Sequence, residues 1–201
     1  MHRQAIAFAL AVALFSLPLS ADHQERIRFS DPAGDITPDE GDAHPIDIVH
    51  VDISSDGEFV VVAVTLAEPP RPTSLFQALV AGVAFDVDNN RTSGGQGFGG
   101  MHGDVPGIDF ESEILSSVED GAVSTSSAAS VIGVDARGNQ SNVLSSSDAP
   151  STPANGKVYT GKIAYTSLGV KPGQTIRVIA RELNDRGERH GMFPEAFLKL
   201  K

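Results

Sequence analysis

Residues 48–67 read IVHVDISSDGEFVVVAVTLA, and this stretch decides the fold class. Apolar residues recur with a period of two over its first part, which is typical of a β-strand and not of a helix. We expect Val49, Val51 and Ile53 to share one face of a strand, and Ile48 to lie on the other.

The second part of this stretch predicts a hairpin partner. Asp56-Gly57 is a strong hairpin-turn signal between two apolar runs. The run from Glu58 to Ala67 is rich in β-branched residues on both faces, as expected of a central strand in a sandwich. Pro69 and Pro70 follow and end the strand.

Similar runs, separated by turn residues, continue along the chain. We predict strands over Leu79–Asp88, Ile108–Val118, Lys157–Tyr165 and Thr175–Leu183, a Ser-rich hairpin over Ala122–Ala136, loops over Asn89–Gly107 and Asn139–Asn155, and one helical turn over Thr166–Gly169. No long window has the spacing of an amphipathic helix. The sequence therefore predicts an all-β fold, a two-sheet antiparallel β-sandwich formed by a single domain.

The first residues predict a secretory signal peptide. Arg3 precedes an apolar run from Ala5 to Leu17, and small residues lead to a cleavage site that we place after Ala21. A membrane anchor is the alternative, but the run is shorter than the about 20 residues that span a bilayer, and Pro18 interrupts it. We expect residues 1–21 to be removed and residues 22–201 to form a secreted or periplasmic domain.

Composition excludes several classes of function. The formal net charge is −11, which argues against binding to nucleic acid or anionic membranes, since both require clustered Lys and Arg. The chain has no cysteine, which excludes disulfides, thiol catalysis and iron–sulfur clusters. No further apolar stretch is long enough to predict a membrane span.

The sharpest chemical motif follows the predicted strand that ends near residue 88. Asp86, Asp88 and Asn90 alternate, and on an extended strand they would share one face. Calcium binds six to eight oxygens from carboxylates, amides and carbonyls, and we predict a calcium site here that Asp109 and Glu111 complete from the next strand. The alternative is a turn shaped by Asp and Asn side chains without an ion.

A second acidic cluster precedes residue 48. Its carboxylates repel one another unless a cation or solvent screens them. We expect Asp35 and Asp47 to lie near an ion, and Asp39, Glu40 and Asp42 to belong to a solvated segment.

Several short motifs, in their order along the chain, resemble a known superfamily. They are Asp31-Pro-x-Gly-Asp35, Pro45-x-Asp47, Phe85-Asp-x-Asp-Asn-Asn90, Thr92-x-Gly94-Gly95, Gly107-x-Asp109 and Ile163-Ala-Tyr165 before Leu168-Gly169. The series is similar to the β-sandwich superfamily of family-nine-type carbohydrate-binding modules and DOMON-like domains. This resemblance implies a jelly-roll-like sandwich, a structural calcium in many members, and a sugar or haem ligand in some.

The sequence departs from the ligand-binding part of this pattern. Sugar-binding members commonly stack rings on aromatic side chains, whereas this chain has no Trp, and we expect Tyr159 and Tyr165 to pack in the core. Haem-binding members use axial Met, His or Lys ligands. The candidates for that role are Met101, His102, His190 and Met192.

No catalytic motif is present: the chain lacks G-x-S-x-G, H-E-x-x-H and a P-loop. We therefore expect a secreted, non-catalytic binding module with structural calcium, and carbohydrate as the candidate ligand. A glycan or a cell-envelope polymer would be its partner. The alternatives are a haem-binding electron-transfer domain, an envelope structural or adhesive protein without a small ligand, and a hydrolase with paired acids in a cleft.

Overall fold

The computed structural model describes residues 24–34, 47–71, 77–97, 105–119, 122–183 and 194–201. The described chain is mostly β, with antiparallel sheets packed against each other, which confirms the predicted all-β sandwich. The predicted signal peptide lies outside the described residues. Within the described part of the chain, no helix is long and apolar enough to cross a membrane.

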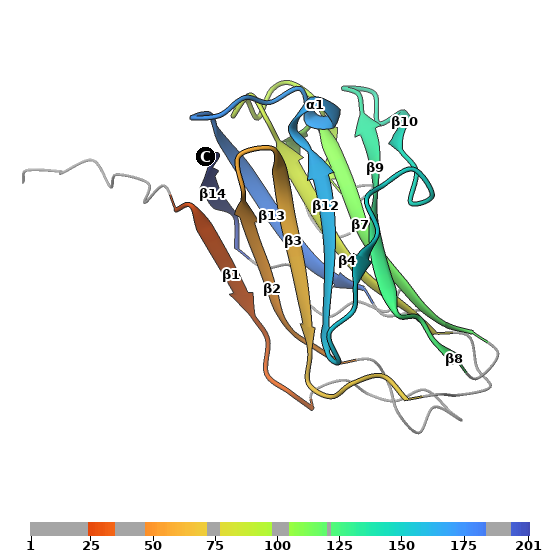
Figure 1. Cartoon of the computed structure of the whole chain (residues 1–201). Coiled ribbons are helices and arrows are strands. Elements are labelled where there is room, and N and C mark those ends of the chain that lie inside the picture. The colour runs from red at the N-terminus through yellow and green to blue at the C-terminus, as the bar shows by residue number, and fades with distance from the viewer. Residues whose placement is uncertain (1–23, 35–46, 72–76, 98–104, 120–121, 184–193) are drawn as a thin grey trace, which may run out of the picture.

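The smaller sheet lies in front in Figure 1 and has the order β1-β2-β3-β12. Its strands are β1 (Arg26–Ser30), β2 (Ile48–Ser55), β3 (Phe59–Leu66) and β12 (Val158–Ala164). The predicted hairpin joins β2 and β3. Asp56 Oδ1 accepts the backbone N–H of Phe59 at 2.9 Å, and Gly57 takes a φ of 101° that favours glycine.

A bulge in β2 changes which side chains face the core. Ile48 pairs with Leu66 and His50 with Thr65, so one extra residue stands between these two pairs. Ile48 is buried and Val49 is only half-buried, and the prediction for these two residues was wrong. The period-two rule reverses the faces wherever a bulge inserts a residue. Beyond the bulge, Val51 and Ile53 are fully buried, as expected.

The larger sheet follows the order β10-β9-β7-β4-β13-β14, and β8 and β11 add short pairings to it. These strands are β4 (Gln77–Asp86), β7 (Phe110–Glu119), β8 (Ala122–Val123), β9 (Ser126–Val134), β10 (Gln140–Leu144), β11 (Thr152–Pro153), β13 (Thr175–Leu183) and β14 (Ala196–Lys199). A separate two-stranded sheet pairs β5 (Gly95–Gln96) with β6 (Pro106–Ile108).

Two predictions for the larger sheet were wrong. Residues 122–136 do not form a hairpin of their own, because β8 and β9 both pair with β7. Residues 139–155 are not one loop, because β10 pairs with β9 and β11 also pairs with β9. β10 is an edge strand with mostly exposed side chains, so it has no apolar alternation from which to predict it.

The core lies between the two sheets. Ala81, Val83 and Phe85 alternate along β4, point inward and are fully buried. Tyr159 and Tyr165 belong to the same core cluster, which confirms their expected packing role.

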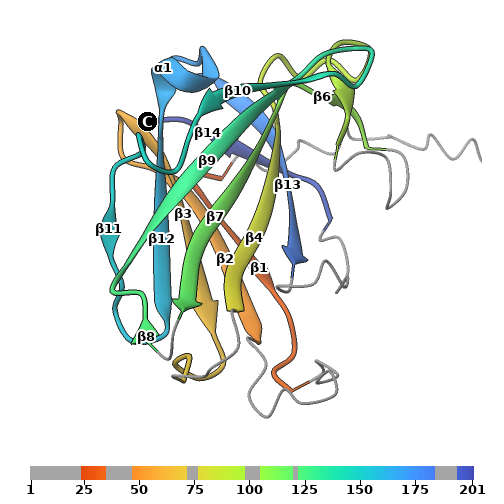
Figure 2. The same cartoon turned by 90° about the vertical axis from the view of Figure 1, so that its right-hand side faces the viewer.

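Several strand ends and the one described helix meet at one end of the sandwich. The predicted helical turn is α1 (Tyr165–Leu168), which follows β12 and ends at Gly169 with a φ of 66°. β4 ends and β7 and β13 begin at this same end, which we call the α1 end. Figure 2 shows α1, β10 and β6 there, with β8 at the opposite end.

Candidate metal centre

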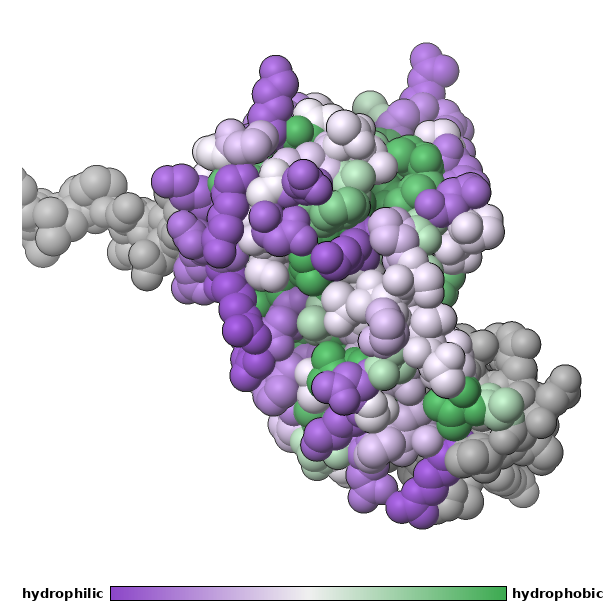
Figure 3. All heavy atoms as spheres, viewed as in Figure 1, coloured by the Kyte–Doolittle hydropathy of each residue, from purple (hydrophilic) through white to green (hydrophobic). Residues whose placement is uncertain are grey.

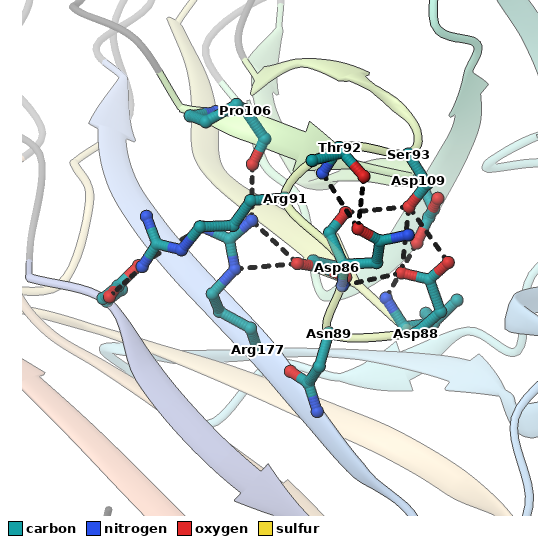
Figure 4. A network of polar contacts seen from close by, with 12 residues as sticks. Asp86, Asp88, Asn89, Arg91, Thr92, Ser93, Pro106, Asp109 and Arg177 are labelled. Atoms are coloured by element: carbon teal, nitrogen blue, oxygen red, sulfur yellow. Dashed lines mark hydrogen bonds and ion pairs between the residues drawn. The ribbon is translucent and has the colours of Figure 1, made fainter.

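The turn after β4 brings two carboxylates together. β4 ends at Asp86, and Asn89 takes a left-handed φ of 55°, which Asn tolerates better than most residues. The backbone N–H of Asn90 then lies 3.1 Å from Asp86 Oδ1 and 2.9 Å from Asp88 Oδ1. One donor thus holds an oxygen of each carboxylate (Figure 4).

Asp109 reaches the same place from the next segment of chain. It lies between β6 and β7, and its backbone N–H donates to the carbonyl of Phe85 at 2.9 Å. Its Oδ2 accepts the backbone N–H of Val87 at 2.9 Å. One oxygen from each of Asp86, Asp88 and Asp109 lies within 4.8 Å of the others. We call these three residues the carboxylate cluster.

Glycine permits this close approach of two segments. Gly107 takes a φ of 78°, and a Cβ on it would lie 2.5 Å from Arg91 Cα and 2.7 Å from the Asn90 carbonyl oxygen. A Cβ on Gly94 would lie 2.3 Å from the Ile108 carbonyl oxygen. Glycine is required at both positions because β6 lies against the turn that follows β4 and leaves no room for a side chain.

The side chain of Asn90 has hydrogen-bond partners within the turn. Its Oδ1 accepts the backbone N–H of Thr92 at 3.0 Å and the Thr92 hydroxyl at 2.7 Å. Ser93 Oγ lies 3.0 Å from both oxygens of Asp88. The contacts of Asn90 are those of a turn shaped by its side chain. Asp86 and Asp88 belong to the same turn, and their carboxylates converge there. Their convergence comes from the turn and not from a shared strand face, since β4 ends at Asp86.

The cluster is only partly neutralised. The guanidinium of Arg177 contacts Asp86 Oδ2 through Nε at 2.9 Å and Nη2 at 2.8 Å. Among the described residues, no Lys or Arg forms an ion pair with Asp88 or Asp109. Burial raises the pKa of Asp109 above its ordinary value, and the charges of Asp88 and Asp86 raise it further. The site therefore carries negative charge that the described protein groups do not balance.

Two further residues of the predicted metal set, Glu111 and Asp47, are described, and both lie away from the cluster. Glu111 sits in β7, paired with Ala84, on the face of the larger sheet that points away from the core, and it does not join the cluster. The i, i+2 rule placed it beside Asp109, but Asp109 stands outside the strand. Asp47 precedes β2 at the end opposite α1, where its Oδ2 accepts the N–H of Gly34 at 2.7 Å. Asp35 lies outside the described residues.

Sequence reasoning missed Arg177. It stands in β13 opposite Asp86, on the outer side of the sheet, and only 2% of it is exposed. A small second core of Ala84, Val105, Ile108 and Ile179 covers this side of the sheet. The only hint in the sequence was an arginine inside an apolar strand, and no local pattern connects it with residue 86.

A groove of about 450 Å³ opens beside the cluster. Its lining includes Asp109 of the carboxylate cluster and the adjacent Val87. The other lining residues include Phe110, Leu168, Asp135, Asn139, Gln140 and Ser141. The hydrogen bond from the Asn139 side chain, with those from backbone N–H groups, holds the pKa of Asp135 below its ordinary value. In Figure 3 apolar surface is visible at the upper right, where Figure 1 places β9 and β10.

No family model, curated protein or solved structure matches this chain. The resemblance to carbohydrate-binding modules and DOMON-like domains therefore stays a prediction. The candidate haem ligands Met101, His102, His190 and Met192 lie outside the described residues.

Proposed function

We propose that this protein is a secreted, non-catalytic β-sandwich module whose carboxylate cluster binds a divalent cation, with calcium as the expected ion. One observation carries the proposal: three carboxylates converge within 4.8 Å, and a cationic side chain contacts one of them. A bound cation would balance the remaining repulsion and tie the turn after β4 to the segment that carries Asp109.

The donor set favours a hard cation that binds oxygen. Calcium takes oxygen ligands in a flexible geometry, and it completes its shell with backbone carbonyls and water. Asp86 is fully buried, Asp109 is half-buried and Asp88 is exposed. The cluster therefore has a protein side and a solvent side. In this proposal the ion is structural, because it orders a glycine-rich loop whose unfolded form has high entropy.

The groove supports a ligand-binding role at the same end. It combines apolar side chains, including the ring of Phe110, with two amides, a hydroxyl and two carboxylates, and its lining contains no Lys or Arg. Such a lining suits a neutral ligand with many hydroxyl groups. Together with the resemblance, it favours carbohydrate or a cell-envelope polymer as the partner.

Thermal unfolding tests the cation. The midpoint of the mature protein is measured in EDTA and again with calcium added. A ligand present at about 100 times its Kd stabilises the folded state by about 2.7 kcal/mol, which raises the midpoint by roughly 5–10 °C for a domain of this size. Calcium should therefore raise the midpoint of the wild-type protein by several degrees.

Asp88→Asn should abolish most of this rise, because it removes one ligand charge from an exposed position and keeps the shape of the side chain. Asp148→Asn is the control, since Asp148 lies in an exposed loop where its described contact is with Ser145. An unchanged wild-type midpoint, after metal removal is verified, would exclude the cation. Equal calcium shifts in both variants would exclude this cluster as its site.

A further inference from the structure

Arg177 is the largest fully buried side chain in the described chain, and it has three polar partners. Its guanidinium binds Asp86 Oδ2, its Nη1 lies 3.2 Å from Glu195 Oε2, and its Nη2 donates to the carbonyl of Pro106. Glu195 is also paired with Arg91. Figure 4 shows this network beside the cluster.

We propose that Arg177 is a positioning and specificity-determining residue of the cation site. It fixes two of the three carboxylates, and its charge matches the site to a divalent ion in preference to a trivalent one. This inference rests on the proposed function.

The positioning role of Arg177 is seen in its contacts with Asp86. Both contacts from Arg177 go to Oδ2, whereas Oδ1 accepts the Asn90 N–H that Asp88 Oδ1 also accepts. The guanidinium therefore fixes the rotation of the Asp86 carboxylate, so that its other oxygen faces the cluster. Asp86 would bind an ion through one oxygen.

The same guanidinium also holds the segment that carries Asp109. Pro106 begins β6, and Asp109 follows the end of that strand. The hydrogen bond to the Pro106 carbonyl keeps β6 beside β13. A Cβ on Gly107 would lie 3.1 Å from Arg177 Nη2, so this packing is tight. Displacement of Arg177 would therefore move Asp86 and the start of the Asp109 segment together.

The second part follows from charge. Asp86, Asp88 and Asp109 supply three negative charges and Arg177 one positive charge, 3 − 1 = 2. Glu195 and Arg91 form a pair whose charges cancel. A net charge of −2 is balanced by a divalent ion, and without Arg177 it would be −3. Because Arg177 is buried, solvent screens its charge poorly.

The experiment compares affinities for Ca²⁺ and La³⁺ by isothermal titration calorimetry, in the wild-type protein, Arg177→Lys and Arg177→Met. The ratio of the two Kd values is the informative quantity, because general damage to the site lowers the affinity for both ions alike. At an effective dielectric constant near 20, removal of a unit charge that lies roughly 6 Å from the bound ion changes this ratio by about a hundredfold. Allowing for screening, Arg177→Met should shift it toward La³⁺ by at least about tenfold.

Arg177→Lys keeps the charge and loses the forked contacts. It should keep the wild-type ratio of Kd values while the affinity for both ions falls. This result would distinguish the effect of Arg177 on the position of the carboxylates from the effect of its charge. Glu195→Gln serves if Arg177→Met does not fold, because the Glu195 side chain is 38% exposed. Glu195 contacts both Arg91 and Arg177, so the loss of this carboxylate leaves one more positive charge beside the site, and the ratio should shift toward Ca²⁺ by a few-fold.

The outcomes separate the two proposals. A wild-type protein that binds neither ion overturns the proposed function, and this inference falls with it. A wild-type protein that binds Ca²⁺, with an unchanged ratio in the folded variants that alter charge, overturns the role of Arg177 alone.

Discussion

Asp109 connects the stability of the protein with the proposed cation site. It is half-buried, and burial raises its pKa, as do the charges of two neighbouring carboxylates. A carboxyl whose pKa is raised by folding favours the folded state at low pH, and this contribution is lost as the pH rises through the folded-state pKa. In the metal-free protein, ionised Asp109 therefore opposes folding at neutral pH.

Asp109→Asn should change which protein, wild type or variant, has the higher midpoint, depending on whether calcium is bound. Asn still accepts the Val87 N–H, so the metal-free variant should unfold about 2–4 °C above the metal-free wild type at pH 7. The two midpoints should converge as the pH falls below about 4, the ordinary pKa of an Asp carboxyl, because Asp109 then becomes protonated in the unfolded state as well. With calcium the order should reverse. Melting curves across pH in EDTA test this, and a less stable metal-free variant at pH 7 would contradict it.

The candidate site could be predicted from the sequence only in part. Asp86, Asp88 and Asp109 were predicted because carboxylates near glycines are a local pattern. Glu111 was misplaced because the chain between β6 and β7 is irregular at Asp109, which breaks the alternation. Arg177 could not be predicted, because its contact with Asp86 joins residues 91 positions apart in the sequence.

At the scale of elements, strands were predictable where one or both faces are buried. β3 and β13 were predicted almost to their ends, since their side chains alternate or are apolar throughout. β10 was missed because it lies at a sheet edge, where most of its side chains are exposed and do not alternate between apolar and polar. The pairing of β8 and β9 with β7 depends on neighbours distant in sequence, which local turn signals do not encode.

The contact between β6 and the turn after β4 gives a prediction about elements. Gly107→Ala should destabilise the protein by about 1–3 kcal/mol through its positive φ alone, and by more because the added Cβ meets Arg91 and Asn90. It should also weaken calcium binding by displacing the Asp109 segment. Urea unfolding and calcium titration measure the two effects.

Gly138→Ala is the matched control for this change. Gly138 has a φ of 77°, close to that of Gly107, but nothing lies within 4 Å of an added Cβ. It should show the conformational strain alone and retain the calcium affinity of the wild type. If both variants bind calcium equally well, the packing of β6 against the turn does not support the site.

For the whole molecule, the sandwich is joined along one edge by segments distant in sequence. Gln24 and Leu198 form a parallel bridge that links the segment before β1 with β14 of the larger sheet. Leu198 and Leu200 are almost fully buried in the core between the sheets. The N–H of Leu200 also donates to the carbonyl of Gln174, just before β13. This segment therefore fastens one sheet to the other.

Leu200→Ala should lower the free energy of unfolding by about 2–5 kcal/mol, because it removes a buried side chain and leaves a cavity. Lys199→Ala, at the neighbouring exposed position, should change it by less than about 0.5 kcal/mol. Urea denaturation of both variants makes the comparison. A small loss for Leu200→Ala would show that this segment packs loosely against the core.

The large separation of Asp86 from Arg177 along the chain also affects the kinetics of folding. Their contact forms when β4 pairs with β13, one of the long-range pairings that are slow to form in β proteins. We expect this pairing, and with it a complete cation site, to form only after the rate-limiting step of folding. An ion bound at such a site lengthens the lifetime of the native state and leaves the speed of its formation nearly unchanged.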